Sequence, residues 1–176
     1  MRKYFTLITI ITTILLFQSC APTLVGLKGD YDSRKKVYYS DKSTDEVWSK
    51  IIELFSRNGN GIKIIDKSSG LIVAEQTDFV KSVTYEDENG KMYHPERFIV
   101  STYQGLSGGE ITPDVITGSW NVRLFEENGK TAFETNLTNI KAYKQDLPTK
   151  FSPGTLYTFT AKSTGVFEKQ IADYIK

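Results

Sequence analysis

Apolar residues recur at helical spacing between residues 43 and 59, at Val47, Trp48, Ile51, Ile52 and Phe55. Serine at position 43 and glutamate at position 46 form the pattern of a capping box, in which each side chain bonds to a free amide of the first helical turn. Asparagine and glycine at positions 58 and 59 tolerate the left-handed backbone that ends many helices. The pattern therefore predicts a helix with one buried face.

A second amphipathic stretch follows Ser163-Thr164 and continues to the last residues of the sequence. Its larger side chains recur at intervals of three and four, which predicts a helix that also covers a core. These positions are Val166, Phe167, Gln170, Ile171, Tyr174 and Ile175.

The chain between the two predicted helices is rich in β-forming residues and turn residues. The runs Ile62–Ile65 and Leu71–Ala74 are joined by Lys67-Ser68-Ser69-Gly70, which predicts a hairpin. An Asn-Gly pair at 128–129 predicts a second tight turn, and another lies at 89–90. Further strands are expected at 36–40, 79–85, 97–103, 119–125 and 131–142.

Large apolar residues fall on nearly alternate positions in the predicted strands at 119–125 and 131–142, so each strand buries one face and exposes the other. The buried face needs a cover, which the two helices can supply. We therefore expect an α+β fold over residues 36–176: a single domain with a curved antiparallel sheet, two helices packed on one face, and the order β-α-β-β-β-β-β-α.

The first part of this domain resembles the repeat unit of BamC-like lipoproteins. The similarity lies in residues 36–76 and rests on Thr44-Asp45-Glu46-Val47-Trp48 with its helix, followed by the hairpin from Gly61 to Glu75. The resemblance implies a fold similar to helix-grip and TATA-binding-protein-like domains. It does not imply an activity, because one fold serves many functions.

The N-terminal residues have the pattern of a secretory signal. Arg2 and Lys3 precede the apolar run Phe5–Phe17, which is shorter than a membrane-spanning helix needs and contains four threonines. The run then changes abruptly to Gln18-Ser19-Cys20-Ala21-Pro22. We expect residues 1–19 to be a signal peptide that is removed.

Cys20 makes this signal specific. Phe17-Gln18-Ser19-Cys20 resembles the lipobox of bacterial lipoproteins, including the looser boxes of Bacteroidota, and the resemblance implies a thioether-linked diacylglycerol on Cys20 and a further amide-linked acyl chain. Two such groups satisfy the requirement of stable anchoring. Cys20 is the only cysteine, so no intramolecular disulfide can form. Residues 20–35, with Pro22, Gly26 and Gly29, are expected to be a lipidated tether.

Charge argues against nucleic acid as a partner. Removal of residues 1–19 leaves 20 of the 22 basic side chains against 21 acidic ones. A nearly neutral, exported domain is not expected to bind nucleic acid.

Candidate catalytic and metal motifs lack the context that their chemistry requires. Gly105-Leu106-Ser107-Gly108-Gly109 matches the nucleophile elbow of serine hydrolases, but Pro113 follows it, no helical pattern begins, and the sole histidine, His94, lies upstream. One histidine without cysteine cannot form a zinc site. Glu86-Asp87-Glu88 lacks the spacing of a calcium loop, and we expect these three residues and His94 to be exposed. Lys162-Ser163-Thr164-Gly165 is expected to begin the second helix.

The aromatic side chains are the one compositional feature that suits recognition of a glycan or a protein. They also pack well in sheets, which is the interpretation we favour. They are Tyr85, Tyr93, Tyr103, Trp120, Tyr143, Tyr157 and Phe159.

We therefore expect a lipoprotein of the bacterial envelope that has no catalytic residues, cofactor or metal. Its expected role is to bind another envelope protein as an accessory or assembly subunit. A periplasmic module that binds a small lipid or glycan is the alternative. The residue after Cys20 is Ala21 and not the aspartate that is associated with inner-membrane retention in enterobacteria. The expected location is therefore the outer membrane, facing the periplasm.

Overall fold

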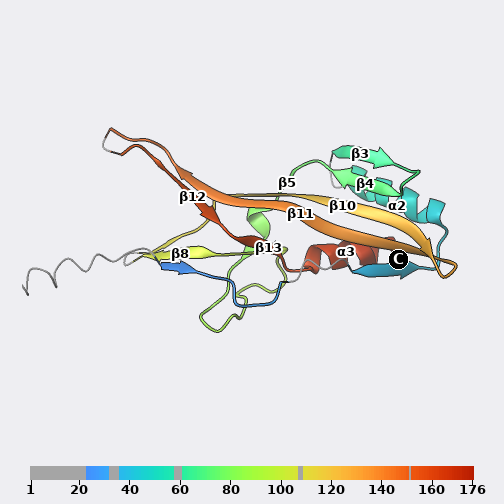
Figure 1. Cartoon of the computed structure of the whole chain (residues 1–176), viewed down its shortest axis with the longest axis horizontal. Coiled ribbons are helices and arrows are strands. Elements are labelled where there is room, and N and C mark those ends of the chain that lie inside the picture. The colour runs from blue at the N-terminus through green and yellow to red at the C-terminus, as the bar shows by residue number, and fades with distance from the viewer. Residues whose placement is uncertain (1–22, 32–35, 58–60, 107–108, 151) are drawn as a thin grey trace, which may run out of the picture.

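The computed structural model describes residues 23–31, 36–57, 61–106, 109–150 and 152–176 (Figure 1). Within these ranges the protein has two α-helices and mainly antiparallel strands, which confirms the α+β class. The strands divide among three sheets rather than the one sheet that we expected.

Both α-helices form where the apolar spacing predicts them. Helix α2 (Thr44–Arg57) begins with the predicted capping box: Glu46 Oε2 accepts hydrogen bonds from the Ser43 amide at 2.9 Å and the Ser43 hydroxyl at 2.7 Å, and the Glu46 amide donates to Ser43 Oγ at 3.3 Å. The expected end at Asn58-Gly59 lies outside the described residues. Helix α3 (Val166–Ile175) buries Phe167, Ile171, Ala172 and Ile175.

The large sheet is built on a long hairpin of β10 (Val115–Glu127) and β11 (Lys130–Asp146). Asn128 (φ 53°) and Gly129 (φ 73°) form its turn, as predicted from the Asn-Gly pair. The strand order is β12-β11-β10-β4-β3, and two short strands, β2 and β5, pair with β11 and β10. The bounds of the added strands are β2 Val37–Ser40, β3 Ile62–Asp66, β4 Leu71–Ala74, β5 Thr77–Asp78 and β12 Thr155–Phe159. The predicted hairpin at 62–74 is confirmed as the β3–β4 pair.

Two three-stranded sheets complete the fold. One has the order β1-β8-β9 (Thr23–Val25, Tyr103–Leu106 and Gly109–Ile111), and the other has the order β13-β7-β6 (Ala161–Ser163, Ile99–Ser101 and Val83–Thr84). The strand expected at 79–85 is shortened to β6, because Val80–Ser82 form a 3-10 helix, η1. The strand expected at 97–103 is interrupted at Thr102, whose amide donates to the carbonyl oxygen of Thr160 at 2.9 Å.

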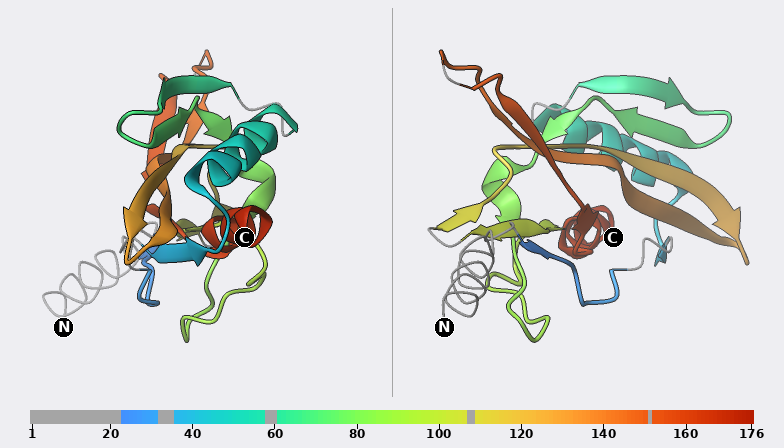
Figure 2. Two further views of the ribbon diagram at one scale, coloured as in Figure 1. Left: turned by 90° about the vertical axis from the view of Figure 1, so that its right-hand side faces the viewer. Right: turned by 60° about the vertical axis from the view of Figure 1, so that its left-hand side comes forward.

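An aromatic cluster joins the helices to the large sheet. The ring centroid of Trp120, on β10, lies 3.9 Å from the ring centroid of Phe55 in α2 and 5.4 Å from that of Phe167 in α3. Phe79 and Phe98 extend the cluster through edge contacts with Phe167. Both helices therefore pack on the face of β10 that carries Trp120 (Figure 2).

Candidate functional site

The predicted lipid site, Cys20, lies outside the described residues and stays a prediction. The described chain begins three residues later, in β1. None of its helices is long and apolar enough to cross a membrane.

Residues 23–31 are bound to the domain, although we expected them to be part of a tether. Thr23–Val25 pair with Tyr103–Gly105 of β8. Glu86 then holds the next turn of chain: its carboxylate accepts hydrogen bonds from the Lys28 amide at 2.6 Å, the Gly29 amide at 2.9 Å and the Tyr31 hydroxyl at 2.5 Å. We call this set of contacts the Glu86 clamp.

Glu86 corrects our expectation that residues 86–88 are all exposed, because only 2% of its surface is accessible. Burial alone would raise the pKa of this carboxyl group, but the hydrogen bonds from the Tyr31 hydroxyl and the two amides outweigh burial and lower the pKa below its usual value. Burial and the neighbouring carboxylate raise the pKa of the Tyr31 hydroxyl. The clamp is thus a buried carboxylate held in its charged form by donors from the N-terminal segment.

The observed geometry of the clamp leaves no space for a side chain at position 29, so Glu86 or Tyr31 would have to move to admit one. A Cβ atom there would lie 2.7 Å from Glu86 Oε1 and 2.7 Å from the Tyr31 ring, closer than van der Waals contact allows. The glycine that we assigned to a flexible tether therefore serves a specific contact.

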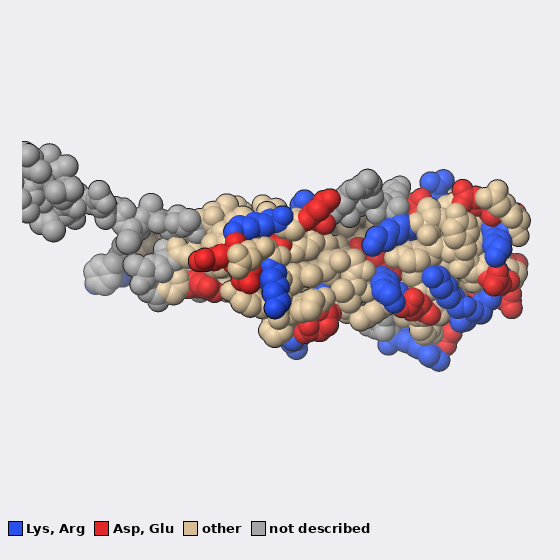
Figure 3. Space-filling model, turned by 90° about the horizontal axis from the view of Figure 1, so that it is seen from below, with Lys and Arg blue, Asp and Glu red and all other residues tan. Residues whose placement is uncertain are grey.

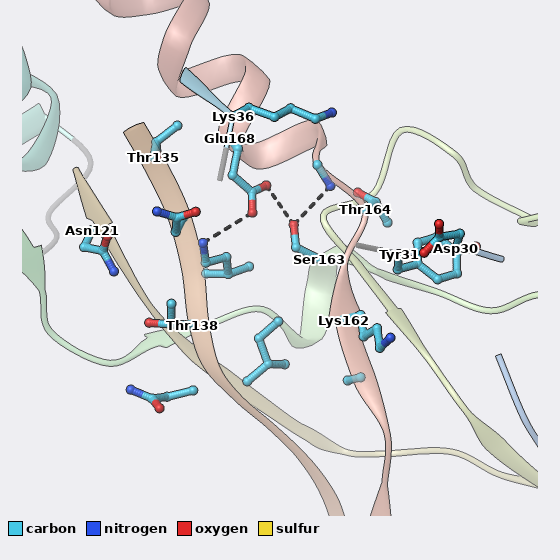
Figure 4. A pocket seen from close by; sticks show the side chains of 16 residues that line it. Asp30, Tyr31, Lys36, Asn121, Thr135, Thr138, Lys162, Ser163, Thr164 and Glu168 are labelled. Atoms are coloured by element: carbon cyan, nitrogen blue, oxygen red, sulfur yellow. Dashed lines mark hydrogen bonds between the residues drawn. The ribbon is translucent and has the colours of Figure 1, made fainter. Parts of the chain in front are cut away.

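A second feature is an interruption in the pairing of β11. The strand pairs with β2 over Thr131–Glu134 and with β12 over Ala142–Asp146. Among the described residues, positions 135–138 and 141 pair only with β10, and positions 139 and 140 form a bulge that pairs with no strand. A cleft of about 1050 Å³ lies along this free edge, and we call it the open-edge cleft (Figure 4). Its lining includes Asn121, Thr135, Asn136, Thr138, Lys162 and Glu168.

Glu168 of α3 occupies one hydrogen-bonding position of the free edge. Its Oε1 atom accepts a hydrogen bond from the Leu137 amide at 3.3 Å, and Oε2 accepts one from the Ser163 hydroxyl at 2.7 Å (Figure 4). The Ser163 hydroxyl also accepts from the Gly165 amide at 3.0 Å. The carboxylate thus stands where a neighbouring strand would present a carbonyl oxygen. The segment 162–165 was expected to cap the second helix, and Gly165 is the N-cap of α3, but Lys162 and Ser163 belong to β13.

Thr135 has an unused hydrogen-bonding group in the cleft wall. The residue is 2% exposed, and among the described residues its hydroxyl has no hydrogen-bond partner. Trp120 Nε1, on the neighbouring strand, is likewise buried and unpaired. Buried polar groups are normally paired, so these two groups are exceptions within the part of the chain that the structure describes.

The other candidates from the sequence do not form a common site. His94 is exposed and its Nδ1 lies 3.5 Å from Glu96 Oε1. In the part of the chain that the structure describes, no group of three or more His, Cys, Asp or Glu residues is placed to hold a metal. The Gly-x-Ser-x-Gly string connects β8 to β9, not a strand to a helix, and its Ser107 and Gly108 lie outside the described residues.

Of the seven aromatic residues considered for recognition, three are buried, three are partly buried (Tyr85, Tyr143 and Tyr157) and one is exposed. Trp120, Tyr103 and Phe159 are buried, whereas Tyr93 is 60% exposed. On the face seen in Figure 3, basic and acidic side chains are interspersed, in keeping with the near-neutral charge of the chain.

Sequence reasoning missed Glu86, Thr135 and Glu168 as site residues. Glu86 was considered only as part of an exposed acidic run, Thr135 and Glu168 belong to no motif, and only the tertiary fold brings Glu168 to β11. A comparison with known protein families and with curated proteins finds no match to this chain.

Proposed function

We propose that this protein is a non-catalytic lipoprotein of the bacterial envelope, anchored by a lipid on Cys20, which binds an extended segment of another envelope protein in the open-edge cleft. The observation that carries the binding role is the stretch 135–141 of β11, which lacks a strand partner on the cleft side among the described residues while the strand is paired on both flanks.

An extended peptide is the natural occupant of such an edge. A strand that adds to a sheet gains main-chain hydrogen bonds, and pockets beside the edge select its side chains. Without a peptide, the Leu137 amide donates to a Glu168 carboxylate oxygen at 3.3 Å. A carbonyl oxygen of an incoming peptide would replace that oxygen, so the Leu137 amide has an acceptor both with and without the peptide.

The bulge in β11 limits the length of the pairing. Asn139 has a left-handed backbone (φ 52°), and the register with β10 shifts between Thr117 and Ser119. Regular pairing is thus available over residues 135–138, about 13 Å of strand. Lys162 and Glu168 place both charge signs beside this stretch, which suits a segment with mixed charges.

The anchor places this binding role in the envelope. The lipobox-like sequence at 17–20 and the resemblance of residues 36–76 to BamC-like lipoproteins support an accessory or assembly role there. The location we propose is the outer membrane, facing the periplasm.

A glycan or small lipid in the same cleft is the second candidate. Side-chain amides and hydroxyl groups, at Asn121, Asn136, Thr138 and Tyr31, line the cleft, and such groups commonly bind sugar hydroxyls.

Site-specific photocrosslinking in the intact envelope tests these roles. A photoreactive phenylalanine analogue replaces Asn136 in the cleft or, as the matched control, the exposed Glu126 of β10. We expect position 136 to capture one protein that position 126 does not capture. Capture of glycan or lipid alone at position 136 would favour the second candidate, and identical products at both positions would contradict a binding role for the cleft.

A further inference from the structure

We propose that the end of the molecule formed by the β1-β8-β9 sheet and the tip of the β11–β12 hairpin rests on the lipid bilayer, with Leu147 and Leu156 as its apolar contact. This inference rests on the proposed lipid anchor at Cys20 and adds how the domain is oriented.

The proposed attachment point lies very close to the folded domain. After cleavage before Cys20, two residues separate the lipidated cysteine from Thr23, the first residue of β1. Three residue steps span at most about 11 Å. The β1–β8 pairing and the Glu86 clamp prevent the following residues from extending this distance. The bilayer surface therefore lies beside β1.

The strand register shows which end of the sheet faces the bilayer. Thr23 pairs with Gly105 and Val25 pairs with Tyr103, so the chain enters β1 next to the β8–β9 connection. This end lies on the left of Figure 1, and the β11–β12 hairpin projects toward the same end. The β10–β11 turn lies at the opposite end of the long axis. The right-hand view of Figure 2 also shows the tip of the β11–β12 hairpin and the β10–β11 turn at opposite ends of the molecule.

The hairpin tip carries the two most exposed large apolar side chains of the described residues. Leu147 is 77% exposed and Leu156 is 61% exposed. Leu156 pairs with Gln145 near the end of the hairpin, and Leu147 is the first residue after β11, so both leucines lie at the tip. Leu24 of β1, at the same end, is 55% exposed.

A bilayer matches this end better than a protein partner does. The lipid on Cys20 would hold the membrane within reach at all times, and leucine side chains lose unfavourable contact with water when they enter the acyl region. Lys150, exposed near the tip, can contact anionic headgroups.

Fluorescent labelling of the lipidated protein tests this orientation. The Cys20 thiol is consumed by its lipid, so a newly introduced cysteine is the single reactive thiol. L147C and L156C report on the tip. I65C is the matched control, because Ile65 is an apolar side chain of similar exposure (56%) on β3, away from that end. Each variant carries an environment-sensitive dye and is reconstituted in vesicles of phosphatidylethanolamine and phosphatidylglycerol.

We expect the dye at positions 147 and 156 to shift its emission to the blue on reconstitution and to be quenched by brominated acyl chains, and the dye at position 65 to show neither effect. Equal responses at the three positions would overturn the proposal. A blue shift at the tip without quenching by brominated lipid would also overturn it, since a second copy of the chain would then cover the leucines. The mass of the N-terminal peptide is measured on the same samples: a peptide without lipid would overturn the anchor itself, whereas a lipidated peptide with equal dye responses would overturn only the orientation.

Discussion

Loss of the Tyr31 hydroxyl should increase local opening of the N-terminal segment, residues 23–31. The Tyr31→Phe substitution keeps the ring and removes one of the three hydrogen bonds to the Glu86 carboxylate. A hydrogen bond to a charged group contributes about 1.5–3 kcal/mol. Only the docking of residues 23–31 depends on this bond, so the loss should appear in local opening of the segment before it appears in global unfolding.

Hydrogen exchange measures this opening directly. Since each 1.4 kcal/mol corresponds to about a tenfold change in an equilibrium constant, the β1 amides that bond to β8 should exchange about ten to a hundred times faster in the Tyr31→Phe variant. Glu86→Ala removes all three bonds and should have a larger effect. Tyr39→Phe is the matched control, because the Tyr39 hydroxyl also donates to a glutamate, Glu127, but at an exposed position. Unchanged exchange in β1, or an equal effect in the control, would refute the clamp.

Three further predictions concern pH and packing. The pKa of Glu86 is lower in the folded protein than in the unfolded chain, so the ionised carboxylate stabilises the fold fully near neutral pH. This stabilisation is lost as the pH falls below about 4. At such a pH, proteolysis within residues 23–31 should increase before the core unfolds. Phe167→Ala should lower the free energy of unfolding by about 3–5 kcal/mol in urea titrations, because it leaves a cavity beside Trp120; a loss under 1 kcal/mol would contradict the packing. Gly70→Ala should be far more destabilising than Gly129→Ala, although both glycines have positive φ angles. At position 70 the new Cβ would lie 2.1 Å from the Leu124 carbonyl oxygen, whereas at position 129 it would meet no atom within 4 Å. Equal melting temperatures of the two variants would contradict the β4–β10 contact.

The elements that the sequence predicted are those with local causes. The capping box at Ser43 and Glu46, the apolar face of α2 and the Asn128-Gly129 turn depend on residues that are close in sequence. The terminal helix was predicted on the same basis.

The small sheets depend instead on distant partners. Thr102 interrupts a β-rich run because its amide pairs with Thr160, 58 residues away, and this contact divides the run between two sheets. Strands β12 and β13 were missed, although Pro153-Gly154 is a turn signal directly before β12 and Leu156, Tyr157 and Phe159 are β-forming residues.

The candidate sites were hidden for the same reason. Glu86 stands in an acidic run whose neighbours are partly or fully exposed, and only the return of residues 28–31 buries it. The free edge of β11 follows from where β2 and β12 stop pairing, which no local pattern specifies. Cys20 is the opposite case, since its prediction comes from the sequence alone.

The proposed anchor is tested most directly by the mass of the N-terminal peptide of the mature protein purified from bacterial membranes. A chain that begins at Cys20 and carries a diacylglycerol with a further amide-linked acyl chain is the predicted result. An N-terminus at another residue, or an unmodified Cys20, would contradict the account.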